Sequence, residues 1–190
     1  MQLVAVAGAT ATCWKLEILG TGKPLQAAHR SLPIMGTVLN LTVYGPDREG
    51  CEEALTKTVK KMISLESHLS RHMAESELSR LNKTGSLASP GTDIVNVLTL
   101  AGDINRRSSG GFDVTILPLL LMHESIRGRN DNPDQNQLIK AKNLANFKDV
   151  QLSRDMIRFA KPGMGISLDG IGKGYIVDQG IATLRKHGFN

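Results

Sequence analysis

The apolar positions of the chain repeat with helical spacing in three long segments. From about residue 49 to 69 they recur every three to four residues, which predicts an amphipathic helix. The same spacing follows Thr92-Asp93, a typical N-cap pair, and stops at the Ser/Gly turn of residues 108–111. A last helix is predicted from about Gly172 to a C-cap at Gly188.

Strand patterns lie between these helices. Residues 38–43 are rich in β-branched side chains and end at the turn of residues 45–47. Residues 150–152 and 156–159 flank a short polar turn and predict a β-hairpin. A glycine-rich loop at residues 163–168 is expected to lead into a further short strand.

Two shorter helical segments complete the pattern. Residues 76–82 predict a helical turn closed by Gly85, and Asn132-Pro133-Asp134 predicts the start of a weaker helix with Asn132 as its cap. Helices alternate with strands, and one connection is a hairpin, so the sequence predicts an α+β fold.

The composition fits a globular protein with one main domain, which we place at residues 28–190. The chain has 190 residues, of which 41% are apolar and 22% are charged, with a net charge of +5. The basic residues form no stripe with interleaved aromatics, so no nucleic-acid partner is expected. No apolar run reaches the ~18 residues of a membrane span. The positive net charge is compatible with an anionic small-molecule ligand.

Residues 1–27 are interpreted as the remnant of an export signal. Residues 3–12 are small and apolar and contain two Ala-x-Ala patterns, although a basic n-region is missing. Thr12 before Cys13 is a poor match to a lipoprotein cleavage box. The alternative is an Ala/Val-rich first strand or a disordered tail. At the other end the chain stops just after Gly188, so a following C-terminal part is expected to be missing.

The cysteines are too few for a disulfide framework. Cys51 is expected to be a small apolar core residue.

The segment Leu168-Asp169-Gly170-Ile171-Gly172-Lys173-Gly174-Tyr175 has the ingredients of a phosphate site. It opens a helix, its glycines allow close backbone approach, and Lys173 adds a cation at the helix N-terminus. It matches neither a Walker A loop nor the Rossmann spacing. The alternative is a glycine-rich turn with a solvated lysine.

Three other segments are weaker candidates. Asp113, after a double glycine and Phe112, either binds a ligand or caps the next turn, and capping is favoured. His68 and His72 have a spacing that places two imidazoles on one helical face, but no third ligand is indicated, so metal binding is not favoured. Met35, beside Gly36, either contacts a flat ligand or packs in the core.

Taken in order, four of these segments resemble the motifs of the ApbE family of flavin transferases. They are Met35-Gly36-Thr37, Ser76–Asn82 (S-E-L-S-R-L-N), Ser109–Leu119 (S-G-G-x-F-D-x-T-x-x-P-L, with one residue fewer before Phe112) and Ser167–Asp178 (D-L-x-x-I-x-K-G-Y-x-V-D). The resemblance covers residues 30–190. It implies a T-fold-related mixed sheet packed with helices. It also implies export to the periplasm, with the inner membrane as a site of anchoring.

The resemblance also implies a set of FAD-binding residues. Met35 would contact the flavin nucleotide, and Lys173 would bind FAD. His72 stands where the family has a stacking Tyr, and its imidazole can still stack. The family's turn that lines the FAD site corresponds to Gly111, Phe112 and Asp113. We expect the Met35 segment, this turn and the Lys173 helix start to converge in space.

Two departures from the family pattern concern charge and metal. The family acid six residues before the lysine is Ser167 here, and Asp169 either substitutes for it from two positions along a strand or marks a variant. The backbone carbonyl of Gly170 would help to hold Mg²⁺, with side-chain ligands expected beyond residue 190.

The activity that the resemblance implies is Mg²⁺-dependent transfer of FMN from FAD to a Thr or Ser hydroxyl of a partner protein, with release of AMP. Acceptors would be flavoproteins such as the FMN-carrying subunits of quinone reductase or Rnf-type complexes. The alternatives are a FAD pyrophosphatase, which makes FMN and AMP with water, and a flavin-binding protein without catalysis. No catalytic residue is predicted.

Overall fold

The computed structural model describes residues 24–34, 36–127 and 134–189. The chain divides into two compact units, an N-terminal unit of residues 1–64 with 176–190 and a central unit of residues 65–175. Across the described residues the class is α+β, as predicted from the sequence.

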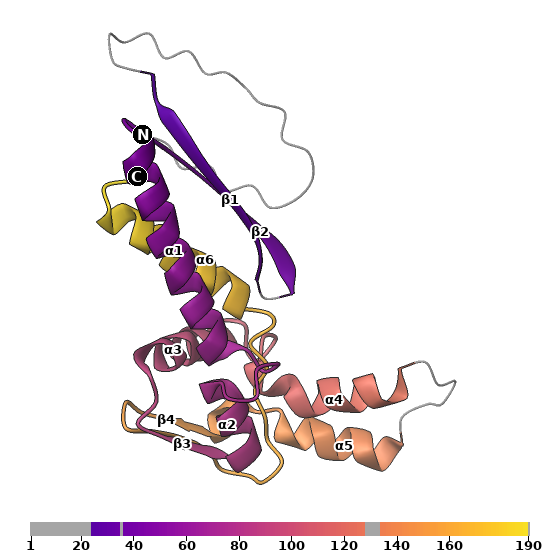
Figure 1. Cartoon of the computed structure of the whole chain (residues 1–190). Helices are drawn as coiled ribbons and strands as arrows, with labels where there is room; N and C mark the ends of the chain where they lie inside the picture. Colours follow the sequence, from indigo (N-terminus) through magenta and orange to yellow (C-terminus); the bar gives the residue numbers. More distant parts are fainter. Residues whose placement is uncertain (1–23, 35, 128–133, 190) are drawn as a thin grey trace. The chain divides into compact units, whose positions relative to one another are not determined.

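The N-terminal unit is a β-hairpin packed against helices (Figure 1). Strands β1 (Gln26–Ile34) and β2 (Thr37–Gly45) pair antiparallel, with Ile34 opposite Thr37. Gly36 occupies the tip with φ +67°, a conformation that favours glycine. Strand β2 was predicted, whereas β1 was not. Its first residues fell in the segment assigned to an export signal, and its remainder alternates too weakly to show a strand.

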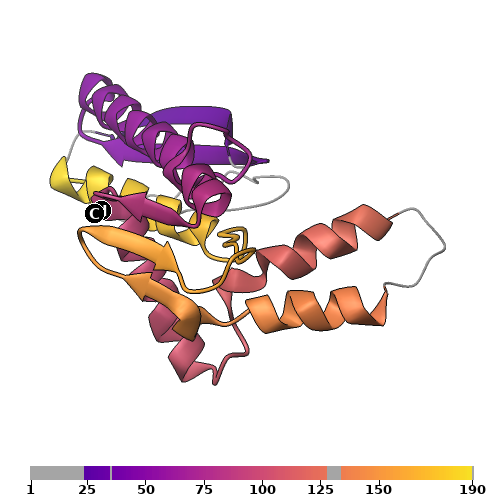
Figure 2. The same cartoon turned by 90° about the horizontal axis from the view of Figure 1, so that it is seen from below.

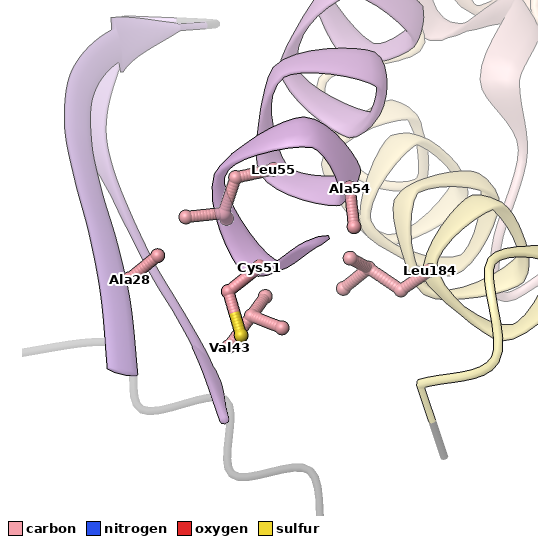
Figure 3. Packing of buried hydrophobic residues seen from close by; sticks show 6 residues of the cluster. All are labelled: Ala28, Val43, Cys51, Ala54, Leu55 and Leu184. Carbon is pink, nitrogen blue, oxygen red and sulfur yellow. The ribbon is translucent and has the colours of Figure 1, made fainter. Parts of the chain in front are cut away.

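Helix α1 (Arg48–Leu69) and helix α6 (Gly172–Lys186) agree closely with their predicted bounds. Side chains of the hairpin, α1 and α6 point toward one another in the core of the N-terminal unit (Figure 3): Ala28, Val43, Cys51, Ala54, Leu55 and Leu184. Cys51 is fully buried, and burial together with the nearby Asp47 and Glu52 carboxylates raises the pKa of its thiol. The predicted role of Cys51 as a small core residue is confirmed.

The central unit combines short helices with a three-stranded sheet (Figures 1 and 2). The helices are α2 (Glu77–Thr84), α3 (Thr92–Arg107), α4 (Leu117–Ile126) and α5 (Gln135–Leu144), with 3-10 turns at Val114–Ile116 and Phe147–Asp149. Strands β3 (Ser86–Ala88), β5 (Met156–Phe159) and β4 (Val150–Leu152) lie in that order, and both pairings are antiparallel. The described strands therefore form two small antiparallel sheets.

The core of the central unit is built from fully buried aliphatic side chains of several elements: Leu78, Leu81, Ile94, Leu98, Ile157 and Ile166. Helix α2 begins and ends as its sequence predicts. Ser76 is its N-cap and accepts from the Ser79 N–H, and Gly85 ends it in the left-handed region.

Helix α4 was missed from the sequence. Residues 117–121 are almost uniformly apolar, so they lack helical periodicity, and Pro118 looks like a helix breaker. Proline is compatible with the first turn of a helix, where Pro118 stands.

Three local expectations are wrong. The loop at residues 163–168 leads into no strand, because the Asn82 amide pairs with both backbone groups of Ile166 in place of a neighbouring strand. Helix α5 is capped by Asp134, which accepts from the Asn136 N–H, whereas Asn132 lies outside the described residues.

Helix α3 has its N-cap one residue earlier than predicted. Its N-cap is Gly91, whose N–H donates to the buried Glu77 carboxylate at 2.7 Å. A carboxylate of α2 thus holds the N-cap residue, and Gly91 has no side chain to cap the first turn of α3.

No helix among the described residues is long and apolar enough to cross a bilayer.

Tyr175, in the first turns of α6, is attached to the start of α3. Its hydroxyl donates to Asp93 Oδ1 at 2.9 Å, and its side chain is buried. Burial, followed by the hydrogen bond to Asp93 and the charge of that carboxylate, raises the pKa of Tyr175 to about 12.

We therefore expect stability to fall as the pH rises from about 10 to 12, because the unfolded chain loses the Tyr175 proton first. Tyr175→Phe should cost about 0.5–1.5 kcal/mol at neutral pH and remove this dependence. Urea unfolding and the ultraviolet absorbance of tyrosinate measure both effects. Tyr44→Phe is the control and should keep the ionisation at high pH that we assign to Tyr175. Loss of that ionisation in Tyr44→Phe would contradict the assignment to Tyr175.

Candidate functional site

The loop of residues 167–171 directly precedes α6 and contains three of the predicted site residues, Ser167, Asp169 and Gly170. Ser167 is buried and its N–H donates to the Val114 carbonyl at 2.8 Å, while Leu168 is buried beside it. The Leu168 carbonyl accepts from the N–H groups of Ile171 and Gly172, which leads the chain into the helix. This anchoring leaves the next two residues, at 169–170, exposed.

Lys173 is exposed in the first turn of α6. The first N–H groups of a helix have no carbonyl partner within it, and the helix dipole places partial positive charge there. An ammonium group added at this position makes the region suited to an anion such as a diphosphate. The predicted geometry of a cation at a helix start is therefore present.

The turn that carries Phe112 meets this loop. A Cβ atom built on Gly170 would lie 3.3 Å from Phe112 Cε2, so the aromatic ring lies directly beside the Gly170 backbone. The turn itself is tight, with φ +52° at Ser109 and +84° at Gly110. The Phe112 N–H donates to Ser108 Oγ at 3.0 Å. The Phe112 ring thus contacts the loop that directly precedes the Lys173 helix start.

Asp113 is a structural cap. Its Oδ1 accepts from the N–H and the hydroxyl of Thr115 at 2.8 and 2.6 Å. Its Oδ2 accepts from Asn105 Nδ2 at 3.1 Å and from the Phe147 N–H at 3.0 Å. Both carboxylate oxygens are thus engaged by protein donors, as the capping interpretation predicted. Gly111 lies exposed in the same turn.

His72 lies in the turn after α1 and is exposed. Helix α1 ends at Leu69, so His68 and His72 do not share a helical face as their spacing suggested. The His72 N–H donates to Ser70 Oγ at 3.3 Å. Among the described residues no three His, Cys, Asp or Glu side chains gather as a metal site.

Arg71 is the residue that sequence reasoning missed. Its Nε donates to Asp169 Oδ2 at 3.0 Å and its Nη2 to Glu124 Oε1 at 3.1 Å. The Arg71 side chain is only 15% exposed, whereas the two carboxylates are half exposed. Arg71 and Asp169 are 98 positions apart, and no local motif connects them.

The environment of Asp169 favours its ionised form. Burial raises the pKa of this carboxyl, but hydrogen bonds from Ser167 and Arg71 and the charges of Arg71 and His72 outweigh burial, so the pKa is lowered. Asp169 and Ser167 are not equivalent positions of a strand. Ser167 is 4% exposed, and its hydroxyl accepts from the Asp169 N–H at 3.3 Å within a turn. The expected shared strand face is therefore wrong, and the substitution of Asp169 for the family acid stays a prediction.

Met35 lies outside the described residues, so its predicted convergence with Lys173 stays a prediction. Two hollows lie away from the predicted site residues. One, of about 280 Å³, is lined by residues around the start of α3, among them His68, Glu77 and Arg80. The other, of about 380 Å³, lies in the N-terminal unit between Asp47, Lys57 and Phe189.

Comparison with known proteins identifies the family. The model of the ApbE family matches residues 35–190, and the chain belongs to that family. No curated protein matches the chain.

Solved structures of the family share the fold. Flavin transferase ApbE from Vibrio cholerae is 23% identical, with a TM-score of 0.75 over 87% of this chain and 55% of that chain. The ApbE protein from Thermotoga maritima is 18% identical, with a TM-score of 0.74 over 85% and 53%. The apo form of flavinyl transferase ApbE from Pseudomonas stutzeri is 21% identical, with a TM-score of 0.72 over 87% and 55%. The chain thus spans little more than half the length of these structures, and the expected ApbE-like fold is confirmed.

The capping role of Asp113 is tested by Asp113→Asn. The amide nitrogen of Asn cannot accept, so at least one of the four donors loses its partner, and stability should fall by about 1.5–3 kcal/mol. Asp103→Asn, at the exposed Asp103–Arg106 pair, is the matched control and should change stability by less than about 0.5 kcal/mol. Urea unfolding measures both. Equal effects of the two substitutions would show that Asp113 does not organise the turn.

Proposed function

We propose that this chain carries the FAD-binding portion of a FAD:protein FMN transferase. The observation that carries the proposal is the family match across residues 35–190, which includes the Lys173 segment. The exposed Lys173 at the start of α6, with the Phe112 ring beside the adjacent loop, supports it. The solved relatives from Vibrio cholerae and Pseudomonas stutzeri carry the names flavin transferase and flavinyl transferase.

In the proposed complex, Lys173 and the first N–H groups of α6 bind the FAD diphosphate. Charge-assisted hydrogen bonds of this kind contribute about 1.5–3 kcal/mol each. Phe112 and His72 offer flat faces for the ring systems of the ligand, and the contact of Met35 with the flavin stays an expectation from the family resemblance. Asp113 acts through the turn that presents Phe112, because its own oxygens are occupied.

The reaction transfers the FMN group through its phosphorus atom. The acceptor Thr or Ser oxygen forms a bond to the FMN phosphorus, the bond from that phosphorus to the bridging oxygen breaks, and AMP leaves with the bridging oxygen. The hydroxyl proton passes to solvent or to a base that these residues do not identify.

Mg²⁺ would neutralise charge on the phosphate oxygens. The described residues do not themselves form a fitting metal site. Among the described residues, only the backbone carbonyl of Gly170 would contact the ion.

The proposal extends to location and partner. The Ala-x-Ala patterns in residues 1–27 support export, with the periplasm, at or near the inner membrane, as the site of action. The acceptor would be a flavoprotein subunit of the quinone-reductase or Rnf type, and no nucleic acid takes part.

The direct test incubates the chain with FAD, Mg²⁺ and a flavin-acceptor domain. Flavin fluorescence that stays with the acceptor in a denaturing gel supports the transferase. Free FMN and AMP without labelled acceptor indicate the pyrophosphatase, and bound but unchanged FAD indicates a flavin-binding protein. Absence of FAD binding overturns the proposal.

Lys173→Ala should weaken FAD binding by about 10- to 100-fold, because one charge-assisted contact to phosphate is lost. Lys173→Arg should recover only part of the affinity, since a planar guanidinium does not occupy the position of a compact ammonium. Lys186→Ala, an exposed lysine in the last turn of the same helix, is the control. Calorimetric titration with FAD measures all three. A wild-type FAD affinity in Lys173→Ala would show that Lys173 does not bind FAD.

His72→Ala should weaken FAD binding by about 1–3 kcal/mol, the usual value of stacking a base on an aromatic ring. His72→Tyr should preserve or tighten it. The control is His123→Ala on the exposed surface of α4. Fluorescence quenching of the flavin on titration reports the affinities. An unchanged affinity in His72→Ala would place this side chain outside the site.

A further inference from the structure

The Arg71 guanidinium joins three segments of the central unit around the candidate site. Arg71 directly precedes His72, Asp169 directly precedes Gly170, and Glu124 lies in α4. Its contacts with Asp169 and Glu124, at 3.0 and 3.1 Å, use different nitrogen atoms and reach different carboxylates. A guanidinium presents five N–H donors in a fixed plane, whereas an ammonium is a point charge, so only arginine suits this bridge.

The position of Asp169 creates an electrostatic problem for an anionic ligand. It stands three residues before the start of α6 and is half exposed. A free carboxylate there would itself be attracted to the helix N-terminus and would repel a diphosphate that approaches it. Its Oδ2 lies 3.0 Å from Arg71 Nε, so the carboxylate is paired with a cation beside the helix start.

We propose that Arg71 is a positioning residue that holds and neutralises the Asp169 carboxylate, so that the start of α6 accepts a diphosphate ligand. The inference rests on the proposed function and adds to it a specificity determinant for ligand charge. Arg71 is sheltered while its partners reach solvent, which suits a group that acts through Asp169 and not on the ligand directly.

A structural role and a charge-neutralising role make different predictions for a ligand series. Riboflavin has no phosphate, FMN has one and FAD has two. If Arg71 serves to neutralise Asp169, Arg71→Ala should weaken FAD binding by about five- to tenfold, FMN binding less, and riboflavin binding by less than about twofold.

The decisive variant is the double substitution Arg71→Ala with Asp169→Asn. Once the carboxylate is neutral, no charge needs to be masked, so FAD affinity should return to within about threefold of wild type. Arg71→Lys should keep part of the affinity. Arg106→Ala, which breaks the exposed Arg106–Asp103 pair, is the matched control and should leave binding unchanged.

Calorimetric titration of each variant with the three flavins is the measurement, after urea unfolding has shown that the variant is folded. Equal losses for FAD and riboflavin, or no rescue by Asp169→Asn, overturn the inference and leave the proposed function intact. Should Arg71→Ala fail to fold, Arg71→Gln with and without Asp169→Asn gives the same comparison, because glutamine removes the positive charge and keeps an amide that donates hydrogen bonds. A wild-type chain that binds none of the flavins overturns the proposed function, and this inference falls with it.

Discussion

The four hydrogen bonds accepted by the Asp113 carboxylate are the constraint on which the central unit depends. They join the end of α3 through Asn105, the 3-10 turn through Thr115 and the chain before β4 through Phe147. An anion with four donors arranged around it is costly to displace, since each charge-assisted bond exceeds a neutral one. The orientation of Phe112, and through it the contact with Gly170, follows from this anchor.

Around that anchor, backbone groups in irregular segments find side-chain partners. The Asn82 amide pairs with Ile166 as a neighbouring strand would. The Glu77 carboxylate accepts from the Gly91 N–H at the start of α3. Buried polar backbone groups must be satisfied in some way. Here two polar side chains of α2 do so, and this leaves the loop before α6 free to present Asp169 and Gly170 to solvent.

The elements with strong local signals could be predicted from the sequence. Helices α1 and α6 follow from periodic apolar residues, the end of α2 from Gly85, and the β4–β5 hairpin from the polar turn between its strands. Helix α4 lacks a periodic signal. Of the site, the Lys173 helix start and the Asp113 cap were apparent, because they depend on neighbours in the chain. Arg71 could not be identified from the sequence, because the two carboxylates that it binds lie 53 and 98 positions away.

Those separations have a kinetic consequence. Two hydrogen-bonded contacts close long chain loops: Arg71 with Asp169 closes one of 98 positions, and Asn82 with Ile166 one of 84 positions. The chain entropy of such a loop is lost before the contact adds any stabilisation. Helices such as α2 form from near neighbours and do not wait for them. We therefore expect the two sides of the candidate site to come together late in the folding of the central unit, so that ligand binding would report a chain that has finished folding.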